Sequence, residues 1–149
     1  MSMFSSFDIN ASGLTAQRYR MDVISENVAN ANTTRTQDGG PYRRKIVTFE
    51  QKGDTTHFSH VLNHAMAHGY SGQGVKAVKV SGDYENEMHM VYDPSHPDAD
   101  ENGYVTYPNV NIVTEMTDMI DASRAYEANA TAFSASKNMA QQGLNLFNQ

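Results

Sequence analysis

The sequence of 149 residues contains no cysteine, no tryptophan and only four prolines. Without cysteine, a disulfide framework, a thiolate metal site and a cysteine nucleophile are all excluded. No apolar run is long enough to cross a membrane. Residues 1–8 have neither the basic cluster nor the apolar core of a secretory signal. If the chain leaves the cytoplasm, we therefore expect another export route.

Basic charge is also scarce, because 11 Lys and Arg residues face 17 Asp and Glu residues. The formal net charge is −6, and the basic run from Arg43 to Lys45 is too short to attract a polyanion. We expect no nucleic acid partner and no direct membrane insertion. The length and a hydrophobic content of 39% suit one unit with a modest core.

Apolar residues at helical spacing occupy both ends of the chain. The row near the start recurs every seven residues and predicts a helix over residues 3–32. Its members are Phe7, Leu14, Met21 and Val28. A longer row of the same period near the end predicts a helix over residues 110–146. Its members are Ile112, Met119, Tyr126, Phe133, Ala140 and Phe147.

The middle of the chain has the pattern of short strands. Two glycines and a proline at residues 39–41 predict a loop. Three β-branched or alternating runs then predict strands, and these cover residues 45–49, 75–80 and 88–92. Between the first two strands, residues 57–67 have helical spacing followed by several glycines, which leaves a short helix or a loop as alternatives.

These patterns predict a fold that is mainly α with a small β-rich middle section. We expect one unit over residues 1–149, with helical segments at 1–35 and 109–149 and the β-rich section at 36–108. The two helices should pair as an elongated coiled coil. Because the two apolar rows differ in length, pairing should leave apolar surface for neighbouring molecules. The ten residues of the two rows are the predicted subunit packing residues.

Four histidines in the middle section form a candidate metal site. Their spacing of three, four and four would place them on one face of a helix, and they are His57, His60, His64 and His68. Neutral imidazole binds Zn, Cu and Ni well. No carboxylate of matching spacing completes the set, and Gly69 follows at once, so a solvated face is the simpler interpretation. A metal-binding module on a coiled-coil scaffold is the alternative function.

Residues 98–109 begin like a calcium-binding loop. Asp98, Asp100 and Asn102 stand at its first, third and fifth positions. The twelfth position, where a bidentate Glu belongs, is Asn109, so we expect a polar turn without calcium. The chain also lacks a nucleophile-elbow motif and a phosphate-binding loop. We therefore expect no enzymatic activity and no cofactor.

Three stretches together resemble the flagellar axial rod and hook family, and specifically its proximal-rod FlgC type. They are SGLTAQRYRMDVISENVANANTTRTQDGGPYRRK from Ser12 to Lys45, VYDPSHPDADENGYVTYPNVN from Val91 to Asn111, and EMTDMIDASRAYEANATAFSASKNM from Glu115 to Met139. The residues that match the family motifs are Asn27, Ala29, Asn30, Arg124, Tyr126 and Asn129. Residues 51–74 depart from the family pattern.

The resemblance implies a structural subunit of the bacterial flagellar basal-body rod. It implies export as an unfolded chain through the flagellar type III apparatus and assembly outside the cytoplasmic membrane by packing of the terminal helices. The implied partners are the export apparatus, copies of the same chain and rod proteins of the FlgB, FlgF, FlgG and FliE types. Asn27, Asn30 and Asn129 are either polar register markers in the helix contacts or solvated helix-end amides.

Overall fold

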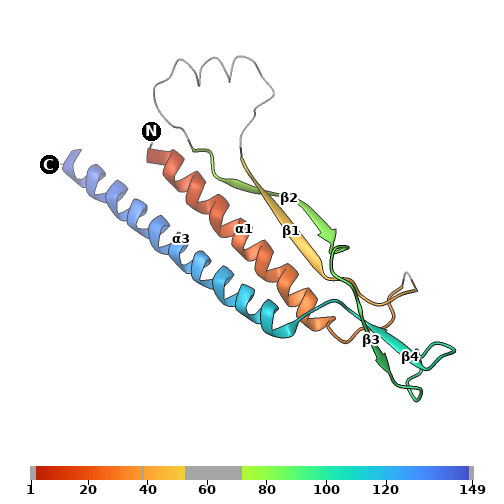
Figure 1. Cartoon of the computed structure of the whole chain (residues 1–149). Helices are drawn as coiled ribbons and strands as arrows, with labels where there is room; N and C mark the ends of the chain where they lie inside the picture. Colours follow the sequence, from red (N-terminus) through yellow and green to blue (C-terminus); the bar gives the residue numbers. More distant parts are fainter. Residues whose placement is uncertain (1–2, 38, 53–71, 148–149) are drawn as a thin grey trace, which may run out of the picture. The chain divides into compact units, whose positions relative to one another are not determined.

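The computed structural model describes residues 3–37, 39–52 and 72–147, which form two long helices and four strands (Figure 1). In chain order the elements are α1 (Met3–Ala29), β1 (Lys45–Gln51), β2 (Val75–Gly82), β3 (His89–Tyr92), β4 (Tyr104–Tyr107) and α3 (Ile112–Phe147). The two predicted helices, the three predicted strands and the predicted loop after the first helix are all present. The predicted helix or loop over residues 57–67 lies outside the described residues.

Helix α1 ends three residues earlier than its apolar spacing predicted, at Ala29. The side chain of Asn30 donates a hydrogen bond of 2.9 Å to the carbonyl of Glu26, and Thr33 donates from its hydroxyl to the Asn30 side chain. Side chains of this kind compete with the helix for backbone hydrogen bonds. The early end therefore follows from the Asn and Thr residues that succeed the helix.

Helix α3 begins immediately after Asn111, which caps it. The Asn111 side-chain oxygen accepts hydrogen bonds from the backbone N–H groups of Val113 and Thr114, at 3.0 and 3.3 Å. These groups have no carbonyl partner within the helix. Glu115 lies in the first turn, where a negative charge interacts favourably with the helix dipole.

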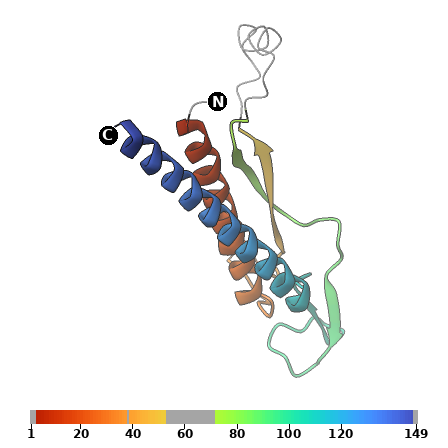
Figure 2. The same cartoon turned by 90° about the vertical axis from the view of Figure 1, so that its left-hand side faces the viewer.

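The strands form two separate two-stranded sheets, β1 with β2 and β3 with β4 (Figure 1 and Figure 2). In the antiparallel β3–β4 pair, Val91 lies opposite Val105 and Tyr92 opposite Tyr104. Gly103 precedes β4 with a φ of 80°, a conformation that favours glycine. The sequence analysis missed β4, because its four residues lie within a segment interpreted as a polar turn.

The chain forms two compact units, and each long helix contributes to both. Unit 1 comprises Met1–Arg18, Phe49–Val78 and Ser123–Gln149, and unit 2 comprises Tyr19–Thr48 and Lys79–Ala122. Among the described residues, neither helix is long and apolar enough to span a membrane.

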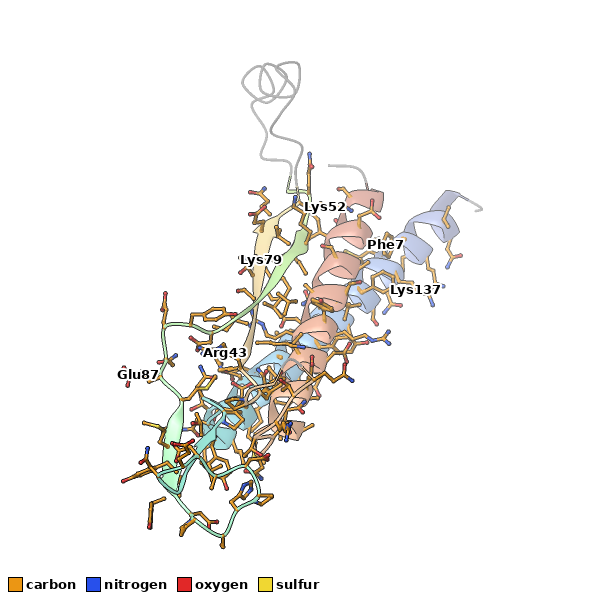
Figure 3. The ribbon with its side chains drawn as sticks, turned by 90° about the vertical axis from the view of Figure 1, so that its right-hand side faces the viewer. Phe7, Arg43, Lys52, Lys79, Glu87 and Lys137 are labelled. Carbon is orange, nitrogen blue, oxygen red and sulfur yellow. The ribbon has the colours of Figure 1, made fainter. Side chains whose placement is uncertain are left out.

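In unit 1, α1 and α3 contact each other with opposite chain directions. The ring of Phe7, which is labelled in Figure 3, meets that of Phe133 edge to face, with the centroids 5.2 Å apart. A Cβ at Gly13 would lie only 2.9 Å from the side chain of Asn129, so glycine permits this close approach. Ser12 accepts a hydrogen bond of 3.0 Å from the backbone N–H of Val75 and thereby connects α1 to β2.

The buried apolar core of unit 2 is small. Its buried apolar residues are Val23, Ile24, Ala31, Tyr42, Val105 and Ala122. Polar side chains complete the interior, since Asn27 is 1% exposed and Glu115 is completely buried. Buried polar groups are stable only when they are hydrogen-bonded or paired, so the partners of these two residues determine how the unit holds together.

Candidate assembly site

Asn27 lies at the centre of a polar junction in unit 2. Its side-chain nitrogen donates to the carbonyl of Lys45 at 2.9 Å and to the Glu115 carboxylate at 3.0 Å. Its oxygen accepts from the backbone N–H of Lys45 at 2.9 Å and from the Tyr42 hydroxyl at 2.8 Å. An amide side chain has two N–H donors and two lone pairs, so every one of its hydrogen-bonding positions is used. Asn27 thus connects α1 to both β1 and α3.

The Tyr42 hydroxyl is held in its protonated form by the junction. Burial, together with the nearby carboxylates of Glu26 and Glu115, raises the pKa of Tyr42 to about 12. Because this folded-state pKa lies above the ordinary value of 10.0, the stabilisation is complete below that value and is lost as the pH rises through about 12. At neutral pH the hydroxyl is therefore a permanent donor to Asn27.

Arg44 neutralises the buried Glu115 carboxylate. Its Nε donates to the Glu115 Oε1 at 2.6 Å, and its terminal nitrogens lie 3.7 Å from Asp83 and 3.5 Å from Asp118. An unpaired carboxylate in this position would cost several kcal/mol. The guanidinium of one β1-flanking residue therefore contacts carboxylates from α3 and from the segment that follows β2.

Asn109 fixes the same region from a third direction. Its oxygen accepts from the Arg44 backbone N–H at 2.9 Å, and its nitrogen donates to the carbonyls of Asp83 and Asn86 at 3.1 and 3.2 Å. Asp83 in turn accepts from the Asn86 side chain at 2.7 Å. The junction is therefore a continuous network from α1 to the start of α3.

Asp83 should make the stability of the chain depend on pH in the acid range. The hydrogen bond from the Asn86 side chain lowers the pKa of Asp83 most; burial opposes it, and backbone N–H groups and Arg44 reinforce it. With a folded pKa below the ordinary 3.8, the stabilisation is complete above that value and is lost as the pH falls through the folded pKa. Urea unfolding should show that the wild-type chain has a higher free energy of unfolding than Asp83→Asn at neutral pH, and that this difference becomes smaller at acidic pH.

Asn86→Ala provides the matched control for this titration. It removes the strongest cause of the lowered pKa while leaving the Asp83 carboxyl in place. When both chains also carry Asn86→Ala, the difference in free energy of unfolding between Asp83 and Asp83→Asn should change much less as the pH falls. A gap that stays constant down to about pH 2 would contradict a lowered pKa for Asp83.

The predicted packing residues lie mostly at the edge of the buried surface. Phe7 and Phe133 contact each other, whereas Ile112 and Tyr126 are 40% and 37% exposed. Five others are half-buried, and they are Leu14, Met21, Val28, Met119 and Ala140. The side chain of Phe147 lies outside the described residues.

The buried apolar face of α1 includes Ala16, Val23 and Ile24, which are 6–7% exposed and are more buried than the predicted row. Ile24 lies three residues after Met21, at the helical spacing of the predicted stripe, whereas Ala16 and Val23 were not predicted as packing residues. Ala16 and Val23 are seven residues apart, so the sequence contained a second row of the same period.

Two of the predicted packing residues, Val28 and Met119, line an apolar groove in unit 2. The groove has a volume of about 550 Å³, and Ser25, Ala29, Met116 and Ile120 complete its lining. Met116 and Ile120 are 55% and 54% exposed. Large apolar side chains that remain this accessible next to each other are typical of surfaces that another protein covers.

The family-motif residues play different structural roles. Asn27 is the buried centre of the junction, whereas Asn30, just after α1, and Asn129, within α3, each donate to a carbonyl four residues earlier. Ala29, Arg124 and Tyr126 are exposed. Of the three asparagines, Asn27 is the buried amide that connects separate segments.

The acidic segment after β3 forms a tight polar turn. Asp100 accepts hydrogen bonds of 2.9 Å from the backbone N–H groups of Asn102 and Tyr104, and Asp98 accepts from the Thr34 hydroxyl at 2.8 Å. These carboxylates therefore hold the turn and attach it to the loop after α1. In the described ranges, no three His, Cys, Asp or Glu side chains are grouped to hold a metal ion. The four candidate histidines lie outside those ranges.

Comparison with known proteins gives matches at both ends of the chain and along its length. The family described as flagella basal body rod protein matches residues 7–36, and the C-terminal family of flagellar basal body rod FlgEFG proteins matches residues 101–146. The flagellar basal-body rod protein FlgC of Borreliella burgdorferi is 45% identical over 148 residues, which cover 97% of each chain. This chain belongs to the FlgC family of flagellar basal-body rod proteins.

Other FlgC proteins match over similar lengths. The FlgC protein of Bacillus subtilis is 45% identical over 151 residues, covering 98% of this chain and 99% of the relative. That of Salmonella typhimurium is 38% identical over 146 residues, covering 98% of each. As a FlgC-family member, the chain is a structural subunit of the basal-body rod and is not an enzyme. It associates with other flagellar rod proteins.

Proposed function

We propose that this rod subunit assembles by packing the exposed apolar side chains of its terminal helices against helices of neighbouring subunits. The observation that carries the proposal is the groove lined by Val28, Met116, Met119 and Ile120 in unit 2. Covering one large aliphatic side chain contributes about 1.5–3 kcal/mol. A helix from a neighbour that fills the groove would cover several of them at once.

The proposed neighbours are copies of this chain and rod proteins of the FlgB, FlgF, FlgG and FliE types. Contacts in a rod join different surfaces of successive subunits, since a two-fold contact would close the assembly. An apolar groove on one surface suits such a heterologous contact, because it needs only a complementary ridge on the next subunit. The association with rod proteins supports this class of partner.

We also propose that α1 and α3 pair as a coiled coil within the subunit. Two contacts in unit 1 support this pairing, Phe7 with Phe133 and Gly13 with Asn129. The residue numbers rise along α1 while they fall along α3, as they do in an antiparallel helix pair. The spacing between the two helices is not uniform along this pair. At Gly13 the α1 backbone approaches α3 closely, whereas at Phe133 two large rings separate the helices. The helices would then be an intramolecular scaffold that presents its remaining apolar side chains outward.

Export through the flagellar type III apparatus as an unfolded chain is the delivery route that we propose. Helices with accessible apolar side chains draw much of their stability from packing against other elements. The exposure of Met139 and Leu144, at 64% and 65%, supports a C-terminal half of α3 that gains stability on assembly. A marginally stable subunit of this kind unfolds more easily for export.

Ile120→Asp tests the groove directly. Ile120 is 54% exposed, so the change should leave the isolated chain folded. In the assembled rod it would place a carboxylate in an apolar contact, at a cost of several kcal/mol. We expect cells carrying this variant to export the protein but to lose swimming, as measured in soft agar and by counting basal bodies in electron micrographs.

Thr117→Asp is the matched control, because Thr117 is an exposed residue of the same helix and does not line the groove. It adds the same charge and should leave swimming unchanged. Normal rods in the Ile120→Asp strain would overturn the proposal. Phe133→Asp is a weaker test, since Phe133 contacts Phe7 and its loss would also disturb the subunit itself.

A further inference from the structure

Strands β2 and β3 each contain four consecutive exposed residues. In β2 these are residues 76–79, and in β3 they are the whole strand. By contrast, exposure alternates along most of β1, and β4 contains the buried Val105. Within the described residues β2 pairs with β1 and β3 pairs with β4, so each of the two exposed stretches keeps one unpaired edge (Figure 1). Unpaired edges are ready to accept another strand.

The exposed side chains of these two strands are largely apolar. In β3, Met90 is 71%, Val91 49% and Tyr92 64% exposed, and in β2 Val78 is 48% exposed. Met and Tyr are enriched where proteins bind each other. A two-stranded sheet is only marginally stable alone, so β3 and β4 would gain from an additional strand. Apolar exposure on both faces is consistent with a strand that is covered in the assembled rod.

The apolar stretch of β2 is flanked by basic residues, and that of β3 is flanked by acidic residues. Lys76 and Lys79 flank Ala77 and Val78 in β2, whereas Glu87 and Asp93 lie on either side of β3. Figure 3 shows the exposed side chains of Lys79 and Glu87. No Lys or Arg occurs from residue 80 to residue 123, so the segment around β3 has no permanently positive side chain of its own to offset its carboxylates.

Lys76 remains available for a partner despite its contact with Glu50. The two charged groups are 3.9 Å apart, and their side chains are 50% and 58% exposed. An ion pair this long and this accessible to water contributes little to stability. A carboxylate from another molecule would therefore compete with Glu50 at little cost.

We propose that β3 of one copy adds to the free edge of β2 in the next copy of this chain. Backbone hydrogen bonds would extend the sheet, and the apolar residues of β3 would pack on Ala77 and Val78. Because β3 has acid at both ends and the β2 stretch has lysine at both ends, charges of opposite sign face each other in either strand direction. The acids are six residues apart and the lysines three, so the long lysine side chains would reach outward to the acids and would not lie directly opposite them. Each added copy still presents one free β2 and one free β3, so the contact continues as an open row.

The inference rests on the proposed function in one respect, namely that copies of this chain are neighbours in the rod. It uses a surface separate from the groove between α1 and α3. Substitutions in the groove should therefore disrupt one contact between subunits, and substitutions in β2 or β3 should disrupt another. Ile120→Asp tests the groove, and variants of β2 and β3 test the strand contact.

Chemical cross-linking in assembled rods tests the contact directly, and because the wild-type chain has no cysteine, this chain contributes no background thiol. The strain would encode a chain with Val78→Cys and Val91→Cys, and purified basal bodies would be treated with a short bis-maleimide. We expect covalent dimers and larger species from the double variant and only monomers from each single variant. The control pair Val78→Cys with Ser134→Cys, which moves the second thiol to α3, should also give monomers.

A charge exchange tests the same contact without cross-linking. Glu87→Lys with Asp93→Lys replaces the two acidic residues that flank β3 by lysine, and Lys76→Glu with Lys79→Glu replaces the two lysines of the β2 stretch by acid. Each doubly substituted chain alone should abolish swimming, whereas co-expression of the two should restore it. Asp8→Lys with Glu127→Lys, two exposed residues elsewhere, controls for net charge and should swim.

Three results would overturn the inference. The first is a swimming double-cysteine strain whose basal bodies yield no more cross-linked dimer than the single-cysteine strains. The second is normal swimming by both charge-reversed strains. The third is that cells expressing both charge-reversed chains swim no better than cells expressing either one alone. If Ile120→Asp rods assemble normally while the cross-link forms, the groove proposal fails and the strand contact stands.

Discussion

Replacing Asn27 by Leu should lower the free energy of unfolding by about 4 kcal/mol. The side chain is 1% exposed and makes four hydrogen bonds, to Lys45 twice, to Tyr42 and to Glu115. Leu has a similar size but offers no partner, so a hydroxyl, a backbone N–H, a carbonyl and a carboxylate would each lose a hydrogen bond in a buried position. Each such loss costs on the order of 1–3 kcal/mol, and partial relaxation reduces the sum. Urea unfolding followed by circular dichroism measures the difference.

Asn30→Ala is the matched control for Asn27. Asn30 belongs to the same motif, but its side-chain nitrogen donates to the Glu26 carbonyl of the preceding helix turn and its oxygen accepts from the Thr33 hydroxyl. Its replacement should cost less than about 1 kcal/mol, because water replaces these partners near the surface. Equal losses for the two variants would mean that the junction does not carry the stability of unit 2.

Glu115→Leu should lower the free energy of unfolding by about 3–5 kcal/mol. The carboxylate is completely buried and accepts from Arg44 at 2.6 Å and from Asn27 at 3.0 Å. Its loss would leave the Arg44 guanidinium, whose side chain is only 23% exposed, with the more distant Asp83 and Asp118. Breaking one half of a buried pair leaves an insufficiently compensated charge, which is the main cause of the expected loss.

A double-mutant cycle with Arg44→Met separates the ion pair from simple burial. If Arg44 and Glu115 compensate each other, the double variant should be more stable than the sum of the two single losses predicts, by about 2–3 kcal/mol. Additive losses would show that the two side chains contribute independently. Asp118→Leu, which removes a half-exposed carboxylate 3.5 Å from Arg44, should cost far less.

The helices and most strands were predictable because their signals are local. A seven-residue repeat in α1 and α3 and alternating runs in β1 to β3 are visible within short windows of sequence. The apolar spacing alone extends α1 to residue 32, but Asn30 and Thr33, whose side chains compete with the helix for backbone hydrogen bonds, also indicate that it stops in this region. Strand β4 was missed because its residues directly follow the acidic turn and were interpreted as part of it, whereas the equally short β3 is visible as an alternating run.

The junction was not predictable from spacing, because its partners are far apart in the chain. Asn27 belongs to a recognisable motif, but nothing near it indicates that Glu115 or Lys45 would be its partner. Glu115 itself resembles an ordinary acidic residue in the first turn of a helix, where exposure is the usual outcome. The buried row of Ala16 and Val23 was overlooked for a different reason, since small side chains are less conspicuous than Phe7 and Leu14.

The hydrogen bond between Asn27 and Glu115 joins residues that are 88 positions apart. Contacts of such long sequence separation must close a large loop of chain, at an entropic cost, before they give any stabilisation. A polypeptide that ended before residue 115 would contain Asn27, Tyr42 and Arg44 but could not complete their hydrogen bonds. A chain that lacks residue 115 should therefore be less stable than the chain that contains it. Such incomplete chains would be more readily cleaved by proteases.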